Sequence, residues 1–326
     1  MHSPLKITAM GGGTGTHTVL SGLKRFPGVD PAAVVSIADN GGSSGKILLD
    51  NWGRMLPTGD IRQCLVALAE VPEEVRARFE KREDGHPYGN LILRDLIRKY
   101  GALEGVRRAH GVFRVRGEVI PASGEHATLC AILEDGTEIV GEDAIEKAVL
   151  DRAPIRECYL KPSVDPNPAA LEAILTSDVI ILGPGDLYTS LVPVLLVPGI
   201  ADALATTEAK LVFVVNLVTK RGQTVGYGAS RFVRTVERHI DDRLVDYVIV
   251  NNGPIPPEAL AKYERDGEAP VVDDLSRIDP RVVRGDYVNR TPVAPQPGDP
   301  LARSLIRHDE HGLVAAIMNR IRMEDA

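Results

Sequence analysis

Short apolar runs alternate with amphipathic stretches along most of the chain. The runs have the length and composition of buried strands: Leu5 to Met10, Val34 to Ala38, Ile155 to Leu160, Val179 to Leu182, Leu211 to Asn216 and Leu244 to Val250. Between them lie segments with apolar residues on one helical face, such as Thr18–Arg25. Because fully apolar strands belong to parallel sheets covered by helices on both faces, this alternation predicts an α/β fold with a mainly parallel sheet.

The pattern changes at about residues 112–141. Phe113 and Val115 alternate with arginines, and Glu134-Asp135-Gly136 separates two strand-like runs, which is a hairpin signal. This predicts an antiparallel β insertion, either a cap beside a ligand site or a cover for one sheet edge. No repeat, low-complexity tract or obvious linker interrupts the chain, so we expect a single α/β domain over residues 1–326.

The first apolar run ends in Gly11-Gly12-Gly13-Thr14-Gly15, and a helix-like segment follows. A strand, a tight turn and a helix start whose amides face the turn form an anion site, usually for phosphate. The loop lacks the last glycine of a dinucleotide fingerprint, because Thr16 stands there, and it has no Walker-type ending. The competing interpretation is a turn that only lets strand and helix pack closely; we favour binding.

A second glycine-rich turn follows the second apolar run. Asp39 lies about two dozen residues beyond the first loop, where α/β nucleotide sites place a carboxylate against ribose hydroxyls. Gly42, Ser43 and Ser44 follow it, and their amides and hydroxyls could hold a phosphate or a sugar hydroxyl. Asp39 could instead only accept hydrogen bonds from its own turn.

A second junction of strand, glycine loop and helix supports the first. Val179–Leu182 runs directly into Gly183-Pro184-Gly185-Asp186-Leu187-Tyr188-Thr189-Ser190. Two such loops at the carboxyl ends of parallel strands can flank one crevice, where an open α/β sheet binds its ligand. Thr189 and Ser190 offer hydroxyls there. Asp186 could cap the helix or touch the ligand, and Tyr188 could stack on a base or simply pack.

Composition removes several function classes. The 326 residues carry a net charge of −7, which gives no overall electrostatic case for nucleic acid or an anionic membrane. The apolar runs are too short to span a bilayer, and the first residues do not read as a secretory signal. Three widely separated cysteines form no C-x-x-C pair, which fits reduced thiols in the cytoplasm.

No catalytic group is identified from the residues alone. The eight histidines show no metal-binding spacing, and no G-x-S-x-G motif is present. Asp39, Asp60 and Asp186 could bind Mg²⁺ between phosphates, but each also has a capping explanation, with Thr58 as the expected N-cap beside Asp60. We therefore expect no protein-held metal, and the residues point to a phosphate-bearing nucleotide as ligand.

Several motifs, in order, closely resemble the YvcK-type gluconeogenesis factor family, relatives of the 2-phospho-lactate transferases. The matching runs are Gly11 to Gly15, Ala38 to Gly45, Gly59 to Leu65, Gly89-Asn90-Leu91, Leu182 to Ser190 and Asn251-Asn252-Gly253. The resemblance implies a three-layer, Rossmann-like fold and a cytoplasmic bacterial protein. It also implies binding of UDP-sugars, notably UDP-N-acetylglucosamine, and a role in cell-wall synthesis, cell shape and growth on gluconeogenic carbon.

The same resemblance supplies further expected ligand contacts. Tyr263 and Arg307 resemble the family's UDP-sugar-contacting tyrosine and arginine; their alternatives are a surface tyrosine and a helix-end arginine. Asn90 and Asn252 lie in matching motifs, and Asn216 ends an apolar run. We expect all five to contact the nucleotide sugar.

Three hypotheses follow. The leading one is a UDP-sugar-binding regulatory factor, with cell-wall synthesis proteins as partners and a homo-oligomer left open. The alternative is a transferase of the 2-phospho-L-lactate type, using a nucleoside-diphosphate-linked donor, a deazaflavin-type acceptor and Mg²⁺. Where the family commonly has two aspartates the chain has Asp39-Asn40, which weakens the case for a metal. An NAD-dependent oxidoreductase is the third, and Thr16 argues against it.

Overall fold

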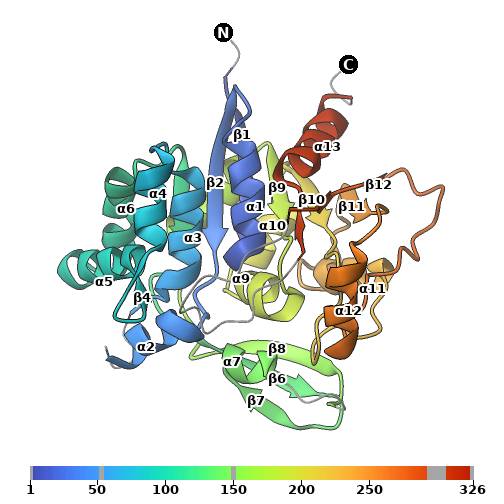
Figure 1. The fold of residues 1–326 in the computed structure, drawn as a ribbon, viewed down its shortest axis with the longest axis horizontal. Coiled ribbons are helices and arrows are strands. Elements are labelled where there is room, and N and C mark those ends of the chain that lie inside the picture. The colour runs from blue at the N-terminus through green and yellow to red at the C-terminus, as the bar shows by residue number, and fades with distance from the viewer. Residues whose placement is uncertain (1–2, 51–54, 148–151, 292–305, 324–326) are drawn as a thin grey trace.

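A seven-stranded parallel sheet forms the centre of the computed structural model, which describes residues 3–50, 55–147, 152–291 and 306–323 (Figure 1). Its strands run in the spatial order β12 (Val282–Gly285), β11 (Tyr247–Asn251), β10 (Lys210–Val214), β9 (Val179–Leu182), β1 (Leu5–Gly11), β2 (Val29–Val35) and β5 (Glu118–Pro121). Every neighbouring pair in this sheet is parallel. The sheet predicted from the apolar runs is therefore confirmed.

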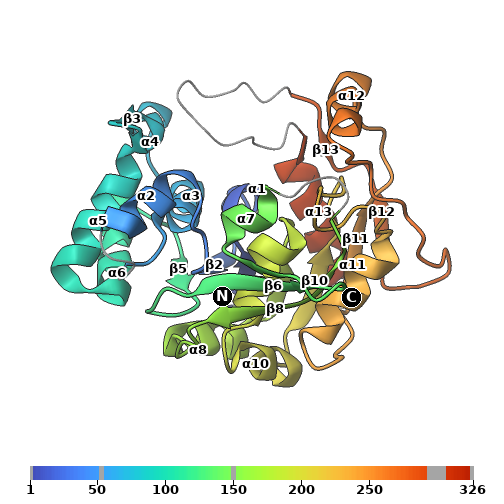
Figure 2. The same cartoon turned by 90° about the horizontal axis from the view of Figure 1, so that it is seen from below.

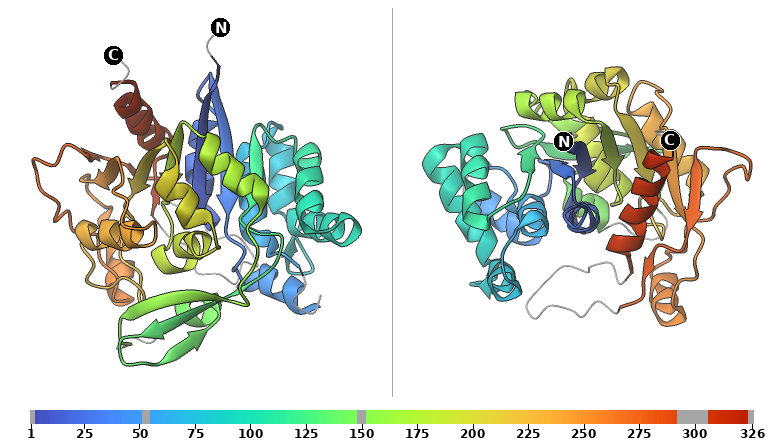
Figure 3. Two further views of the ribbon diagram at one scale, coloured as in Figure 1. Left: turned by 180° about the vertical axis from the view of Figure 1, so that it is seen from behind. Right: turned by 90° about the horizontal axis from the view of Figure 1, so that it is seen from above.

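Helices cover both faces of the sheet and complete three layers (Figure 2). One face carries α1 (Gly13–Leu23), α3 (Thr58–Leu68) and α13 (Glu310–Arg322). The opposite face carries α8 (Pro168–Thr176), α9 (Val192–Leu195) and α10 (Ile200–Thr206), which Figure 3 shows from behind. Strands between two helical layers have no solvent-facing side, which explains why all four residues of β9 are buried.

The remaining elements extend the two edges of the sheet. Beyond α3 and β5 lie α2 (Gly42–Asp50), α4 (Glu73–Glu80), the short pair β3 (Arg82–Glu83) and β4 (His86–Pro87), α5 (Tyr88–Tyr100) and α6 (Ala102–Phe113). Around β11 and β12 lie α11 (Ala229–Arg238), α12 (Pro257–Arg265), β13 (Val288–Asn289) and β14 (Arg307–His308). The short π-helix η1 (Leu187–Leu191) follows β9.

The strand order reverses between β1 and β9. The chain builds β1, β2 and β5 outward in one direction, and then returns to place β9, β10, β11 and β12 on the other side of β1. The connections that follow β1 and β9 therefore leave the sheet in opposite directions. We call the region at the carboxyl ends of these two strands the crevice, because open α/β sheets bind their ligands at such a reversal point.

A separate three-stranded antiparallel sheet lies beyond the carboxyl ends of the main strands (Figure 1). It contains β7 (Glu138–Val140), β6 (Thr128–Leu133) and β8 (Ile155–Lys161), and α7 (Glu142–Glu146) follows β7. The hairpin predicted at Glu134-Asp135-Gly136 joins β6 to β7. The small sheet therefore lies at the same edge as the crevice.

The boundaries of this insertion differ from the expected 112–141. Phe113 ends α6, where it is buried at helical spacing from Val106 and Ala109, so its alternation with arginines was not strand periodicity. The strand β5 belongs to the main sheet, whereas β8 pairs antiparallel with β6. A period-2 pattern shows that a strand forms but does not show which sheet it joins.

The two ends of the described chain lie far from the small sheet. The start of β1 and the end of α13 reach the opposite edge of the main sheet in Figure 1. Among the described residues no single helix has the length and apolarity needed to cross a membrane; one sharply bent pair, Leu187–Leu195 with Ile200–Thr206, meets the criterion only when taken together.

Candidate functional site

The first glycine loop (Gly11–Gly15) and the second glycine loop (Gly183–Ser190) lie side by side at the carboxyl ends of β1 and β9. A Cβ atom on Gly15 would stand 2.0 Å from the carbonyl oxygen of Pro184, so only a hydrogen atom fits between the loops. A Cβ on Gly185 would likewise face the first loop, 3.7 Å from a carbonyl oxygen there. The two loops are therefore in direct contact, and their place around a ligand stays a prediction.

A protein carboxylate occupies the helix start of the first loop. The Gly13 amide donates a hydrogen bond to Asp60, and a Cβ on Gly12 would stand 2.1 Å from Asp60 Oδ2. Asp60 thus bonds to the first turn of α1. The prediction that Thr58 caps α3 is wrong, because Pro57 is the N-cap of this helix and makes no side-chain capping bond. The amide expected to face a phosphate faces a carboxylate, because α3 brings Asp60 against the positive end of α1.

Asp39 accepts hydrogen bonds from its own turn and from a neighbour. Its Oδ1 accepts from the Gly41 amide at 2.9 Å, and the Ser44 hydroxyl also bonds to it. Ser44 in turn accepts from the Gly59 amide at 2.9 Å, which ties the Asp39 turn to the start of α3. Burial raises the pKa of Asp39, and burial together with the Asp39 charge raises the pKa of Asp60 well above its usual range.

Two further carboxylates reach the crevice from α7 of the small sheet. Glu142 accepts from the Asn40 amide at 3.2 Å, and Glu146 lies 3.5 Å from the Thr189 hydroxyl, which donates to it. Burial and the neighbouring acids raise the pKa of Glu142 well above normal, and burial and Asp186 raise that of Glu146 to about 7. We call Asp39, Asp60, Glu142 and Glu146 the acidic end of the crevice.

Sequence reasoning missed both glutamates. Their signal is an acidic pair four residues apart, Glu142 and Glu146, directly after the hairpin strand that ends before Gly141. The pair becomes meaningful only once the small sheet is known to lie over the carboxyl ends of β1 and β9. The insertion thus contacts both the Asp39 turn and the second glycine loop, which favours a cap at the carboxyl edge over a cover for a lateral sheet edge.

The second loop is held from the segment that follows β10. Asp186 forms an ion pair with Lys220 at 3.4 Å, and this charge raises the pKa of Lys220. Thr189 accepts from the Gln223 side-chain amide at 3.3 Å. Lys220 and Gln223 were not predicted, although their position after a parallel strand at the same edge of the sheet is a usable signal.

Three predicted contacts have their polar groups engaged inside the protein. The Tyr188 and Tyr227 hydroxyls lie 3.0 Å apart, and the Tyr188 ring is buried, so it packs within the core. The buried Asn90 accepts from Arg62 Nε and donates to the Ser43 hydroxyl, both at 2.9 Å. Asn90 and Ser43 therefore build the wall that joins α2 to α5.

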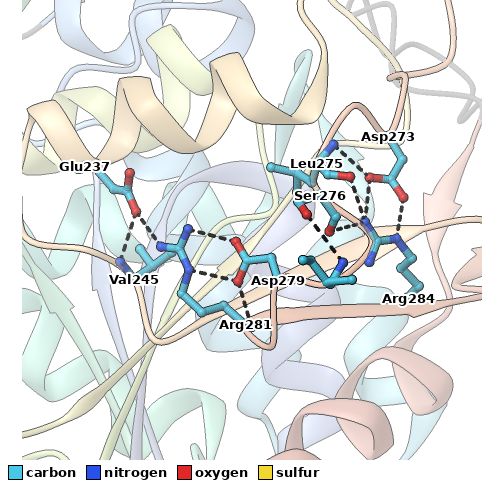
Figure 4. A network of polar contacts seen from close by, with 9 residues as sticks. Glu237, Val245, Asp273, Leu275, Ser276, Asp279, Arg281 and Arg284 are labelled. Atoms are coloured by element: carbon cyan, nitrogen blue, oxygen red, sulfur yellow. Dashed lines mark hydrogen bonds and ion pairs between the residues drawn. The ribbon is translucent and has the colours of Figure 1, made fainter.

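A cavity of about 310 Å³ opens at the carboxyl ends of β10 and β11. Its walls include Leu217, Ile255, Leu260, Val271, Asn252 and Asp273. Asn252 directly follows β11 and is exposed, and Asn216 lies two residues after β10 and is half-buried. Arg284 on β12 holds Asp273 in place with bonds of 2.5 and 3.2 Å (Figure 4).

Tyr263 bonds to the residue that precedes Arg307, at the start of β14. The Tyr263 hydroxyl accepts from the Ile306 amide at 3.1 Å, and its ring is buried in a cluster with Leu217. Arg307 follows Ile306 and lines a second cavity of about 410 Å³, together with Thr14 of the first loop. Tyr263 thus fixes the backbone from which Arg307 extends.

Across the described ranges no group of three or more histidine, cysteine, aspartate or glutamate side chains is placed to hold a metal ion. The carboxylates of the acidic end are instead engaged by amides and hydroxyls: Gly13 bonds Asp60, Gly41 and Ser44 bond Asp39, and Asn40 bonds Glu142.

A doubly wound parallel sheet with two glycine loops at its reversal point defines an open α/β protein with its ligand site at the carboxyl edge. The profile of the family described as 2-phospho-L-lactate transferase CofD matches residues 7–288. The chain therefore belongs to this family, in the branch of the gluconeogenesis factors, as its motifs predicted.

Relatives of known name and structure cover nearly the whole chain. The gluconeogenesis factor of Bacillus subtilis is 36% identical, over 97% of this chain and 98% of its own. That of Halalkalibacterium halodurans is 39% identical, over 83% and 85%. The crystal structure of a UPF0052 family member from Bacillus halodurans is 34% identical, with a TM-score of 0.87 over 98% of this chain and all of that one.

Proposed function

We propose that this gluconeogenesis factor binds a UDP-sugar, UDP-N-acetylglucosamine, in the cytoplasm. Binding would regulate cell-wall synthesis, cell shape and growth on gluconeogenic carbon, through contacts with cell-wall synthesis proteins. The observation that carries the proposal is the cavity shared by Thr14 and Arg307, two residues from opposite ends of the chain.

The smaller cavity has the chemistry of a base site. Apolar walls from Leu217, Ile255 and Val271 suit the two faces of a flat pyrimidine ring. The Asn252 side chain offers one donor and one acceptor, which matches the alternating acceptors and donor on the edge of uracil. Asn216 directly precedes the lining residue Leu217 in the chain, and we assign it to the rim of the same site.

We assign the two phosphates of the ligand to Arg307, which supplies a positive charge in the cavity. The Gly13 amide already bonds Asp60, so the helix start of the first loop offers less to an anion than its sequence predicted. An arginine supplies fixed, forked donors that match phosphate oxygens. The diphosphate would therefore lie between Arg307 and the Thr14 hydroxyl, on the cavity side of α1.

The acidic end suits sugar hydroxyls. Carboxyl groups with a raised pKa carry less negative charge at neutral pH, so they can lie near a diphosphate and still exchange hydrogen bonds with hydroxyls. Asp39, Glu146 and the Thr189 and Ser190 hydroxyls meet this need at the carboxyl edge. We assign the sugar to this side of the crevice.

Isothermal titration calorimetry with UDP-N-acetylglucosamine tests the proposal. We expect saturable binding, weaker for UDP and absent for N-acetylglucosamine alone. Arg307→Gln should weaken it, whereas the exposed Arg322→Gln near the end of α13 should not. Absence of heat with well-folded protein at high ligand concentration would contradict the proposal.

The acidic end also favours one alternative, a transferase. Glu146, with a pKa of about 7, has the properties of a general base beside the second loop. It would accept the proton from an acceptor hydroxyl, whose oxygen attacks the phosphorus of a nucleoside-diphosphate-linked phospholactyl donor as the nucleotide leaves. Mg²⁺ would be required only under this reading. Mass spectrometry after incubation with a deazaflavin acceptor tests it, and a product absent from Glu146→Gln would support it.

A further inference from the structure

The cavity that contains Thr14 and Arg307 continues along one face of α1. Thr14, His17, Ser21 and Lys24 line it at intervals of three or four residues, the spacing of a single helical face. Ten residues of helix span about 15 Å, at about 1.5 Å per residue. The end at Lys24 is therefore remote from the first glycine loop.

Two cations converge at that end on one neutral acceptor. Lys24 Nζ donates to the Ala69 carbonyl oxygen at 2.9 Å, and Arg76 Nη2 donates to the same oxygen at 3.4 Å. Ala69 is the C-cap of α3, and a helix C-terminus carries only about half a negative charge. Arg76 Nε is also buried with no hydrogen-bond partner among the described residues. One helix end thus offsets only part of two positive charges.

Among the described residues, the carboxylates of the cavity wall pair with arginines and leave Lys24 without an ion-pair partner. Glu310 pairs with Arg25 at 3.2 Å, and Glu73 lies 3.5 Å from Arg76 with its side chain 78% exposed. Within the described part of the chain, no carboxylate lies at ion-pair distance from Lys24. Where Lys24 and Arg76 meet, the Lys24 charge therefore has no carboxylate partner, and the exposed Glu73 is the only ion-pair partner of Arg76 among the described residues.

Nearby positive charges contribute to lowering the pKa of two groups along this face of α1. Burial first, and then Arg307, Arg62, Arg76 and Lys24, lower the pKa of His17 to about 3, so the imidazole is neutral. Burial, Arg76 and Arg25 lower the pKa of Lys24 to about 8, although Glu70 and Glu310 oppose the shift. An anion bound in the cavity would raise the pKa of both groups, because it would offset the nearby positive charges.

We propose that the Lys24–Arg76 end of this cavity binds the phosphoryl group of a small phosphorylated metabolite, separately from the nucleotide sugar. Lysine and arginine together give a point charge and a forked donor, the usual pair for phosphate oxygens. The cavity volume of about 410 Å³ accommodates a small metabolite. The distance along α1 places this end beyond reach of a diphosphate held at Thr14.

Calorimetric titration with glycerol 3-phosphate tests the site, with glycerol as the uncharged control. We expect binding of the phosphate ester only, and a dissociation constant raised about tenfold in Lys24→Met, which keeps the side-chain length but removes the charge. Lys99→Met on the exposed face of α5 is the matched control and should bind like the parent protein. Equal affinity in all three proteins, or no binding by folded parent protein, would overturn the proposal.

Proton uptake gives a second readout that is specific to Lys24. At pH 8 the phosphate ester is a dianion, and Lys24 with a pKa of about 8 is close to half protonated. Binding should raise that pKa and take up about half a proton, measurable as a dependence of the heat on the buffer's ionisation enthalpy. Binding without uptake would remove Lys24 from the site.

A final titration separates this site from the proposed nucleotide-sugar site. Glycerol 3-phosphate is titrated into protein saturated with UDP-N-acetylglucosamine. Unchanged affinity would support two sites, whereas competition would overturn the separate site and assign these cations to the nucleotide's own phosphates. Should UDP-N-acetylglucosamine fail to bind, the result with glycerol 3-phosphate and Lys24→Met stands independently.

Discussion

The two ends of α1 carry opposite charges and satisfy them differently. At its N-terminus, the acidic end of the crevice is internally satisfied, because amides and hydroxyls from three surrounding segments bond Asp39, Asp60 and Glu142. At its C-terminus, Lys24 and Arg76 share a single carbonyl oxygen. Both arrangements match the helix dipole, but the acids have their hydrogen bonds inside the protein, whereas Lys24 has no carboxylate at ion-pair distance among the described residues.

This difference indicates what each end contributes. A cluster whose hydrogen bonds are made inside the protein holds the two glycine loops and the small sheet together. The raised pKa values of its carboxyl groups suit hydrogen bonding to hydroxyls. An unsatisfied cluster gains most from an added anion. We call Lys24, Arg76 and Arg307, which line the same cavity, the basic side. We therefore expect substitutions at the acidic end to change stability and those on the basic side to change affinity for phosphates.

The largest expected effect is on the contact between the two loops. In Gly15→Ala the new methyl group would overlap the Pro184 carbonyl, which lies 2.0 Å from the Cβ position. Overpacking of this kind costs about 3 kcal/mol of unfolding free energy. Urea denaturation measures it. Gly111→Ala in α6, where no atom lies within 4 Å of the added carbon, is the control and should be neutral or slightly stabilising. Equal effects would contradict the close approach of the loops.

The next largest effect is on ligand affinity, and it distinguishes the basic side from the acidic end. Arg307→Gln should weaken UDP-N-acetylglucosamine binding by about 2 kcal/mol, or about thirtyfold, because a charge-assisted bond to phosphate is lost. Its unfolding free energy should change little, in contrast to Gly15→Ala. Titration calorimetry and urea denaturation of the same preparation measure both quantities. Loss of stability with unchanged affinity would reverse the roles that we assign to the two regions.

Local sequence determined the central sheet and the neighbouring loops. The fully apolar run of β9 followed by Gly183 allowed only a buried strand and a tight turn, and the rule for parallel sheets placed that turn beside Gly11. The error at Phe113 has the opposite cause. Its helical partners Val106 and Ala109 precede the alternating pattern, so Phe113, the last residue of α6, was interpreted as the first residue of a strand.

The details of the site depended on contacts distant in sequence. Asp60 could be read only as a residue in the first turn of its own helix, because its partner Gly13 lies 47 positions earlier. Glu146 reaches Thr189 only through the placement of the small sheet, and Lys24 meets Arg76 only at the end of a third helix. No local pattern encodes these pairings.

A smaller effect is expected where the basic side is held in place. Tyr263→Phe removes the acceptor of the Ile306 amide, which costs about 1 kcal/mol and loosens the backbone before Arg307. We expect UDP-N-acetylglucosamine affinity to fall about fivefold, less than for Arg307→Gln. Tyr159→Phe in the small sheet is the control. An affinity loss as large as that of Arg307→Gln would instead indicate direct contact between the Tyr263 hydroxyl and the ligand.

The smallest effect tests the acidic end through pH. The pKa of Glu146 is raised from 4.5 to about 7, so the folded state binds more protons than the unfolded state between these values, and its stability falls as pH rises through them. Glu146→Gln cannot ionise and escapes this loss. Its Tm relative to the parent protein should therefore be about 2 °C higher at pH 8 than at pH 5.

Differential scanning calorimetry at the two pH values measures this difference, with the exposed Glu157→Gln of β8 as the control that should shift equally at both. A shift of Glu146→Gln that does not depend on pH would mean that Glu146 is as well solvated as Glu157. The acidic end would then lack the burial that distinguishes it from the basic side, and the assignment of sugar hydroxyls to it would lose its electrostatic basis.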